Sequence, residues 1–201
     1  MKIAIFASGS GSNFEAIVRA VQEGRLQGIE VGLLVCDKPA AFVTQRAKNL
    51  GVQSFVFDPK SYPDKAAFET EIVNRLQEAG ITFVVLAGYM RIVGPTLLCA
   101  FEGRMINLHP SLLPAFMGKD AIGQALEYGV KLTGATVHFV DAGLDTGPII
   151  KQVPVAVEQD DTHETLAARI HSVEHELLTE VLQDIADKKL FVEGRKVRYL
   201  A

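Results

Sequence analysis

Residues 2–24 read KIAIFASGSGSNFEAIVRAVQEG, and this stretch decides the fold. After Lys2 the run to Ala7 is continuously apolar, which is typical of a strand buried on both faces. A turn of glycine and serine follows, and Asn13–Glu23 then show the apolar spacing of a helix, with Gly24 just beyond its end. A buried strand joined by a tight turn to a helix predicts the first unit of a parallel α/β sheet.

The same alternation of strand and helix continues through the first half of the chain. Further β-type runs occur at Glu30–Cys36, Gln53–Phe57, Thr82–Ala87 and Arg104–Leu108. Helical patterns lie between them at Ala40–Leu50 and Asp64–Ala79. Continuous apolar strands need helices on both faces, so we predict a three-layer, doubly wound, mostly parallel α/β sheet with a Rossmann-like N-terminal half.

After residue 108 the pattern becomes mixed. We expect a short helix near Asp120–Tyr128 and two strands, Leu132–Val140 and Pro148–Val157, joined by a loop that contains glycine. A last helix is expected to start at Asp161, an acidic N-cap that precedes Glu164 at the third helical position. The C-terminal half is therefore predicted to be mixed α and β, in one domain (1–201) with the first half.

Size and composition narrow the class of protein. With 201 residues, of which 48% are hydrophobic, the chain can bury one full core. A net charge of −4 and the lack of a Lys and Arg run argue against a nucleic-acid partner. No apolar stretch approaches the roughly 20 residues of a membrane span. Cys36 and Cys99 lie in separate apolar stretches and are expected to be buried free thiols. We predict a cytoplasmic protein with small-molecule substrates and no membrane partner, either a monomer or a homodimer.

The turn Ser8–Asn13 is a candidate anion site. It places free backbone N–H groups and the positive end of a helix dipole in one turn, and Ser12 or Asn13 could cap the helix and donate to a phosphate. A dinucleotide site is an alternative, because Gly9-x-Gly11 begins a GxGxxG motif and Asp37 ends the second strand. Phe14 stands where the third glycine would be, which favours a monophosphate; a merely tight turn is the remaining alternative.

The run Asn107-Leu108-His109-Pro110 carries the strongest sign of chemistry. Asn107 and His109 alternate with apolar residues, so both side chains should point the same way at the carboxyl end of a strand. A second signal is Asp145, in a loop after the strand that contains His138. Buried hydrogen-bonded side chains and simple turn chemistry are the structural alternatives. Together the amide, the imidazole and the carboxylate suit acyl transfer, because they offer donors for an oxyanion and an acid that favours the charged histidine.

Four motifs carry a resemblance to a known family. They are Gly11-Ser12-Asn13, Gly88-Tyr89-Met90-Arg91-Ile92-Val93, Asn107-Leu108-His109-Pro110-Ser111-Leu112-Leu113-Pro114 and Leu144-Asp145-Thr146-Gly147. In order and spacing they closely resemble the folate-dependent formyltransferases, specifically the glycinamide ribonucleotide formyltransferase family. The resemblance covers nearly the whole chain.

The resemblance implies a reaction and a set of residues. A formyl group would move from 10-formyltetrahydrofolate, a co-substrate, to the amine of 5'-phosphoribosylglycinamide in de novo purine (IMP) biosynthesis, with no metal. Asn107 and a protonated His109 would stabilise the oxyanion, and Asp145 would keep the histidine charged. The nucleotide would contact Gly11, Ser12, Asn13 and Glu174. The folate would contact Lys65, Met90, Arg91, Ile92, Val93, Asn107 and Asp141. Residues 1–100 would form the nucleotide-phosphate-binding half, and 101–201 the catalytic and folate-binding half.

Two departures and three other readings stay open at this point. Met117 stands where the family has proline, and His171 where a relative has glutamine. His171-Ser172-Val173-Glu174-His175 also spells H-x-x-E-H, an inverted zinc-protease signature, although it lacks an evident third ligand. A formyltetrahydrofolate hydrolase would share the Asn, His and Asp residues, and a non-catalytic nucleotide sensor would share the cradle. His138 and His163 are assigned to structure or solvent.

Overall fold

The computed structural model describes residues 1–200 of the chain. Its internal contacts divide it into two compact units, Met1–Ile106 and Asn107–Ala201. The prediction of one domain with two functional halves stays a prediction.

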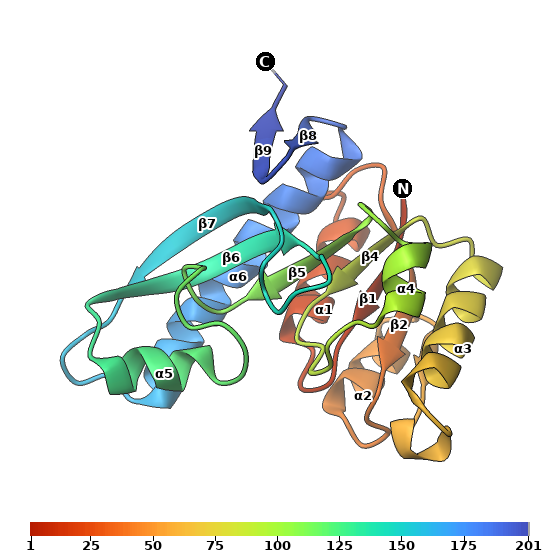
Figure 1. The fold of residues 1–201 in the computed structure, drawn as a ribbon, viewed down its shortest axis with the longest axis horizontal. Helices are drawn as coiled ribbons and strands as arrows, with labels where there is room; N and C mark the ends of the chain where they lie inside the picture. The colour runs from red at the N-terminus through yellow and green to blue at the C-terminus, as the bar shows by residue number, and fades with distance from the viewer. Residues whose placement is uncertain (201) are drawn as a thin grey trace. The chain divides into compact units, whose positions relative to one another are not determined.

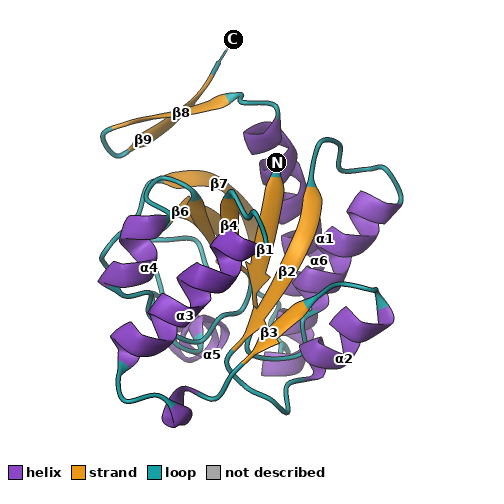
Figure 2. Ribbon diagram, turned by 90° about the vertical axis from the view of Figure 1, so that its right-hand side faces the viewer, coloured by secondary structure: helices purple, strands orange, loops and turns teal. Residues whose placement is uncertain are grey.

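The first unit is a parallel sheet with helices on both faces. Its strands are β1 (Lys2–Phe6), β2 (Glu30–Cys36), β3 (Ser54–Val56) and β4 (Phe83–Leu86), and every pairing among them is parallel. Its helices are α1 (Ser12–Gln22), α2 (Phe42–Asn49), α3 (Lys65–Glu78) and α4 (Pro95–Ala100), with the 3₁₀ helix η1 at Pro59–Ser61. Helices α1 and α2 cover one face of the sheet, and α3 and α4 cover the other (Figure 2).

Burial explains why the strands of this unit are continuously apolar. Ile3, Ala4, Ile5 and Phe6 of β1 have no exposed surface, so residues that point to opposite faces of the sheet are equally buried. Fully burying one such large side chain contributes about 1.5–3 kcal/mol. The C-terminal end of α1 is marked by a glycine. Gly24, with φ of 73°, comes two residues after Gln22 and takes the left-handed conformation that commonly ends a helix.

The second unit is mixed. Strand β5 (Met105–His109) starts just before the boundary, and β6 (Leu132–Phe139) pairs antiparallel with β7 (Ile149–Ala156). Helix α6 (His163–Ala186) packs on β6 and β7, and α5 (Ala121–Tyr128) contacts α6 (Figure 1). A separate hairpin, β8 (Leu190–Glu193) and β9 (Lys196–Tyr199), follows α6. The hydrogen-bonded strand order is β3-β2-β1-β4-β5-β6-β7, which confirms the predicted mostly parallel, doubly wound α/β fold.

Two predicted helix starts are wrong. Helix α1 begins at Ser12, and its N-cap is Gly11 in the left-handed region, so neither Ser12 nor Asn13 caps it. A Cβ atom at position 11 would lie 2.3 Å from Val43 of α2, so a glycine is needed both for its φ of 77° and for this close approach. Helix α6 has Thr162, not Asp161, as its N-cap, because Thr162 and Thr165 form a reciprocal capping box.

Some features were not predicted at all. Helix α4 and the 3₁₀ helix η1 are too short to show a clear periodicity, and the hairpin β8–β9 joins two strands of only four residues each. The expectation of two buried thiols is half wrong, since Cys36 is buried whereas Cys99, on α4, is exposed. Within residues 1–200, no helix combines the length and the apolar composition needed to cross a bilayer.

Candidate active site

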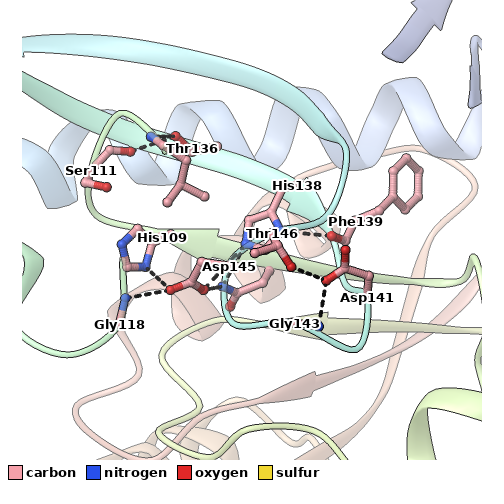
Figure 3. A network of polar contacts seen from close by, with 12 residues as sticks. His109, Ser111, Gly118, Thr136, His138, Phe139, Asp141, Gly143, Asp145 and Thr146 are labelled. Carbon is pink, nitrogen blue, oxygen red and sulfur yellow. Dashed lines mark hydrogen bonds and ion pairs between the residues drawn. The ribbon is translucent and has the colours of Figure 1, made fainter. Parts of the chain in front are cut away.

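Strand β5 places Asn107 and His109 at its carboxyl end with both side chains on one side, as their alternation predicts. The Asn107 amide nitrogen lies 3.3 Å from Asp145 Oδ1, and His109 Nδ1 lies 3.5 Å from Asp145 Oδ2. The three predicted catalytic residues are therefore brought together within the second unit. Figure 3 shows the His109 ring facing the Asp145 carboxylate. His109 is only 5% exposed, so its ring is held in a largely dry environment.

Asp145 reaches this cluster from the loop between β6 and β7. Its backbone has φ of 54°, a left-handed conformation that aspartate tolerates better than most residues. The Gly118 N–H donates to Asp145 Oδ2 at 2.8 Å, which fixes the carboxylate between that backbone group and His109. A second carboxylate shapes the same loop, because Asp141 accepts hydrogen bonds from the Gly143 N–H and the Thr146 hydroxyl (Figure 3).

His138, which the sequence pattern assigned to structure or solvent, lies in the same cluster. Its Nε2 lies 3.1 Å from the Asn107 amide nitrogen and 3.7 Å from Asp145 Oδ1. Its Nδ1 faces the Phe139 carbonyl oxygen at 2.8 Å. A carbonyl only accepts, so Nδ1 carries the proton, and the bare Nε2 of a neutral ring accepts from Asn107. The alternation of Thr136 and His138 on β6 was the signal that could have revealed it.

His109 has the opposite environment, because acceptor oxygens face both of its nitrogens. Its Nε2 donates to the Phe116 carbonyl at 2.8 Å, and its Nδ1 faces the Asp145 carboxylate. A doubly protonated, cationic imidazole satisfies both contacts. The cluster thus places two histidines with different hydrogen-bonding environments around a single carboxylate.

The pKa of Asp145 reflects these neighbours. Burial alone would raise this pKa, but hydrogen bonding, in which the Gly118 N–H is one donor, and the positive charge of His109 outweigh the burial and lower it. The carboxylate is therefore ionised at neutral pH and available to stabilise a cation on His109.

The turn after His109 is fixed by polar contacts to the β6–β7 hairpin. The buried Thr136 hydroxyl donates to the Ser111 carbonyl at 2.6 Å and accepts from the Leu113 N–H at 3.1 Å. The Gln152 amide donates to the Leu113 carbonyl at 2.9 Å. Because these bonds hold the turn 110–114 against the sheet, the imidazole that precedes it has little freedom to move (Figure 3).

In the first unit, Gly11, Ser12 and Asn13 form the turn that opens α1, as the cradle prediction requires. Ser12 and Asn13 occupy the first two helical positions, at the positive end of the helix dipole. Asp37 argues against the dinucleotide alternative. This residue is only 3% exposed and its carboxylate accepts from the Ser8 hydroxyl and from Arg91 Nε, so it is engaged within the protein.

Comparison with known proteins agrees with this geometry. Residues 1–182 match the formyl transferase family model. The chain belongs to the formyl transferase family. It is 52% identical over 184 residues to phosphoribosylglycinamide formyltransferase of Bacillus subtilis (strain 168), covering 92% of this chain and 94% of the relative. The crystal structure of glycinamide ribonucleotide transformylase 1 from Symbiobacterium toebii has a TM-score of 0.97 and 45% identity, and the match covers 100% of this chain and 94% of that one. The enzyme of that name from Geobacillus kaustophilus has a TM-score of 0.89 and 56% identity over 92% of this chain and 98% of its own.

The residues expected to contact folate in this formyl transferase lie in different settings. Met90, Arg91 and Ile92 are exposed and Val93 is half-buried, in the irregular segment between β4 and α4. Lys65 is the first residue of α3, and its ammonium lies 4.0 Å from the buried Glu69. Asp141 lies in the Asp145 loop, and the two groups that donate to it, the Gly143 N–H and the Thr146 hydroxyl, belong to the same loop.

Glu174 is buried in α6 and accepts from His171 Nδ1 at 2.7 Å. This hydrogen bond, opposed by partial burial, raises the pKa of His171, whereas burial lowers the pKa of His175. Within residues 1–200, no three His, Cys, Asp or Glu side chains gather in a way that could hold a metal ion. Met117 follows Phe116, whose φ of 54° is strained for an aromatic residue, in the segment that contacts His109 and Asp145.

Proposed function

We propose that this chain is a phosphoribosylglycinamide formyltransferase, which moves the formyl group of 10-formyltetrahydrofolate to the amine of 5'-phosphoribosylglycinamide. The observation that carries the proposal is the convergence of Asn107, His109 and Asp145 within the second unit. Relatives with this activity in their names, matching more than nine-tenths of the chain, support the substrates.

The reaction needs two donors at one oxygen atom. The amine lone pair attacks the formyl carbon, a C–N bond forms, and the carbonyl oxygen becomes an oxyanion. The amine then loses a proton, the bond from the formyl carbon to N10 of the folate breaks, and N10 takes up a proton. Asn107 and His109 supply the N–H groups for the oxyanion, and one such donor contributes about 2.7–4 kcal/mol to the barrier reduction.

Both donors have partners within the protein, so they exchange partners when the substrate binds. His109 Nε2–H moves from the neutral Phe116 carbonyl to the oxyanion. Asn107 gives up its longer contact, 3.3 Å to Asp145, and keeps the 3.1 Å contact to His138. The exchange is favourable because a hydrogen bond to an anion is roughly twice as strong as one to a neutral acceptor.

Asp145 has a separate role, which is to keep His109 protonated and to accept the proton that the attacking amine loses. Its ionised carboxylate stabilises the cationic form of His109 and accepts the proton that the attacking amine loses, directly or through a water molecule. This division of labour explains why the site needs an acid as well as two donors, and no step in it requires a metal.

The remaining substrate contacts follow from the family resemblance. The backbone at Gly11, Ser12 and Asn13 holds the phosphate of the ribonucleotide. Glu174 contacts the same nucleotide. The folate is held by Lys65, by the segment Met90–Val93 and by Asp141. The left-handed Gly11 turn lies at the positive end of the α1 helix dipole, where an anion is favoured, and this supports the phosphate assignment.

The test follows release of tetrahydrofolate from 10-formyltetrahydrofolate with and without the ribonucleotide. We expect release only when the ribonucleotide is present. His109→Ala should lower kcat about 10²- to 10³-fold and change both KM values less than about threefold. His163→Ala is the matched control, since His163 is an exposed histidine paired with Asp120, and it should leave turnover unchanged. Release in water alone would identify a hydrolase, and a fully active His109→Ala would refute the proposal.

A further inference from the structure

Three strand ends of the first unit bring Ser8, Asp37 and Met90 together. Strands β1, β2 and β4 are parallel neighbours, so their carboxyl ends lie at one edge of the sheet. Ser8 follows β1, Asp37 follows β2, and Met90 lies four residues beyond the end of β4. Ser8 and Asp37 are both only 3% exposed, so their polar atoms depend on partners within the protein.

These residues form a chain of hydrogen bonds in which each donor and each acceptor can be assigned. The carboxylate of Asp37 can only accept, so the Ser8 hydroxyl donates to Asp37 Oδ1. The Ser8 oxygen in turn accepts from the Met90 N–H at 2.9 Å, and the Ser8 N–H donates to the Gly88 carbonyl at 2.9 Å. The backbone of the segment Gly88–Gly94 is therefore attached at two points near its start to a buried serine that the acid orients.

Arg91 adds a third attachment in the same segment. Its Nε donates to Asp37 Oδ2 at 2.7 Å, and its guanidinium lies 5.8 Å from the centre of the Phe68 ring. The ion pair neutralises a carboxylate that would otherwise be buried and unpaired. A guanidinium has five N–H donors, so the bond through Nε leaves donors at its two terminal nitrogens for another acceptor.

The far end of the segment is held by a different buried acid. Glu69 of α3, which is 2% exposed, accepts from the Gly94 N–H at 2.6 Å and from the Leu97 N–H at 3.3 Å. A Cβ atom at position 94 would lie 2.7 Å from Glu69 Oε2, so a larger residue here would require the Glu69 side chain to shift. Glu69 thus ties the end of the segment to the start of α4.

Packing holds the segment between its two ends. The Tyr89 ring packs edge-on against Phe6 of β1, with 5.2 Å between the ring centres. Burial, reinforced by the negative charge of Asp37, raises the pKa of Tyr89 well above its usual range. Met90 and Ile92 nevertheless stay 63% and 58% exposed, so a rigid backbone presents apolar side chains outward. Exposed apolar residues on a fixed backbone suit a flat heterocyclic ligand.

We infer that Asp37, acting through Ser8 and Arg91, and Glu69, acting through Gly94, are positioning residues that hold the segment Gly88–Gly94 in its folate-binding conformation. The inference rests on the proposed function, because it takes this segment as the folate contact. Backbone groups recognise a ring only if they are already fixed, since ordering them on binding would cost affinity. Asp37 and Glu69 supply that order from outside the segment.

The experiment compares four variants with the wild type for binding of tetrahydrofolate, the folate product, by titration calorimetry. Asp37→Ala removes both acceptors and should weaken binding about tenfold, and Ser8→Ala about fivefold. Asp37→Asn keeps an acceptor for Ser8 but loses the charge opposite Arg91, so its loss should be intermediate. Asp58→Ala is the control, since Asp58 accepts from the Lys60 N–H to cap η1 in the same unit and should bind folate within about twofold of the wild type.

Two further readouts separate positioning from general loss of stability. In steady-state assays Asp37→Ala should raise KM for 10-formyltetrahydrofolate and leave KM for the ribonucleotide and kcat nearly unchanged. Hydrogen exchange of the Met90 amide should be faster in Ser8→Ala and Asp37→Ala and unchanged in Asp58→Ala. If Ser8→Ala and Asp37→Asn fold and bind tetrahydrofolate as tightly as the wild type, the inference is wrong.

The proposed function fails in a distinguishable way. A wild-type protein that binds tetrahydrofolate, loses this binding in Asp37→Ala, and transfers no formyl group to the ribonucleotide would refute the proposed reaction and support the positioning role. A wild-type protein that transfers the formyl group, while all four variants bind tetrahydrofolate normally, would support the proposed reaction and refute the positioning role.

Discussion

At the scale of single residues, the orientation of the Asn107 amide depends on His138. Its amide nitrogen donates to His138 Nε2 at 3.1 Å, and this ring is itself held by the Phe139 carbonyl. An amide can rotate to present either its oxygen or its nitrogen, and a bare imidazole nitrogen opposite it selects the nitrogen. His138 therefore fixes Asn107 in the orientation in which it can donate to an oxyanion.

His138→Ala should lower kcat about fivefold to tenfold, because the lost hydrogen bond lets the Asn107 amide rotate. Both KM values should change little, since the reaction's ground-state contacts stay in place. His138→Gln offers an amide oxygen as acceptor and should recover part of the loss. Steady-state kinetics of the two variants check this, and equal kcat for His138→Ala and wild type would contradict it.

The His171–Glu174 pair predicts a pH dependence of stability. The hydrogen bond to Glu174 raises the pKa of His171 above its unfolded value, although partial burial opposes this. A raised folded-state pKa means that the stabilisation is complete below the unfolded pKa and is lost as pH rises through the folded one. Because the ring is half exposed, the contribution is under about 1 kcal/mol.

We therefore expect His171→Gln to be less stable than wild type at about pH 5.5 and closer to it at about pH 9. Urea unfolding at the two pH values measures the difference. A gap that widens with rising pH would show that the sign is wrong.

At the scale of elements, the start of α1 depends on one glycine. Gly11 has φ of 77°, and a Cβ there would lie 2.3 Å from Val43 of α2, whereas nothing lies within 4 Å of a Cβ at Gly9. Left-handed backbone costs a residue with a Cβ about 1–2 kcal/mol before any clash is counted. Replacement by a residue with a Cβ should therefore be tolerated at Gly9 but not at Gly11, although both lie in the same turn.

Gly11→Ala should lower the free energy of unfolding by about 2 kcal/mol or more, and Gly9→Ala by less than about 0.5 kcal/mol. Gly11→Ala should also raise KM for the ribonucleotide, because it displaces the first turn of α1. Chemical denaturation and steady-state kinetics test both statements. Equal stability of the two variants would show that the contact with Val43 relaxes without cost.

The hairpin β8–β9 lies beyond the residues that match the family model, yet it contacts the catalytic loop within the second unit. Arg195, at its turn, donates to the Thr146 carbonyl at 3.0 Å. Thr146 in turn donates to Asp141, and Asp145 precedes it in sequence. The hairpin therefore braces the loop that carries the catalytic acid.

Removing this brace with Arg195→Ala should lower kcat about twofold to fivefold, since one exposed hydrogen bond is lost. Amide exchange at residues 143–146 should become faster. Arg198→Ala is the control, because Arg198 pairs with Glu193 inside the hairpin. Identical effects of the two variants would mean that the contact with Thr146 is irrelevant.

For the molecule as a whole, the zinc-protease alternative and formyl transfer predict different metal contents. The zinc-protease alternative requires one bound zinc ion for each chain, whereas formyl transfer requires none. Glu174, the acid of the H-x-x-E-H sequence, already bonds to His171, and burial lowers the pKa of His175. We expect purified protein to contain less than stoichiometric zinc by elemental analysis. Dialysis against a chelator should leave formyl transfer unchanged. Turnover that is lost on dialysis and restored by zinc would overturn this.

Much of the fold could be read from the chain because it depends on local patterns. The strands β1, β2 and β4 are continuous apolar runs, and β2 was located at its observed bounds. Helix ends were less secure, since Gly11 replaced the expected Ser12 or Asn13 cap and Thr162 replaced Asp161. The β8–β9 hairpin had a signal that went unused, a two-residue turn containing Gly194 between two short β-type runs.

The sequence alone determined the alternation of elements and the shared face of Asn107 and His109, because both follow from the fixed periods of strands and helices. It also carried the family resemblance. The tertiary structure alone decided that His138 turns Asn107, that the Phe116 carbonyl accepts from His109, and that Asp37 and Glu69 hold the segment Gly88–Gly94. These contacts join residues from different strands and loops, and local periodicity does not specify which distant groups meet.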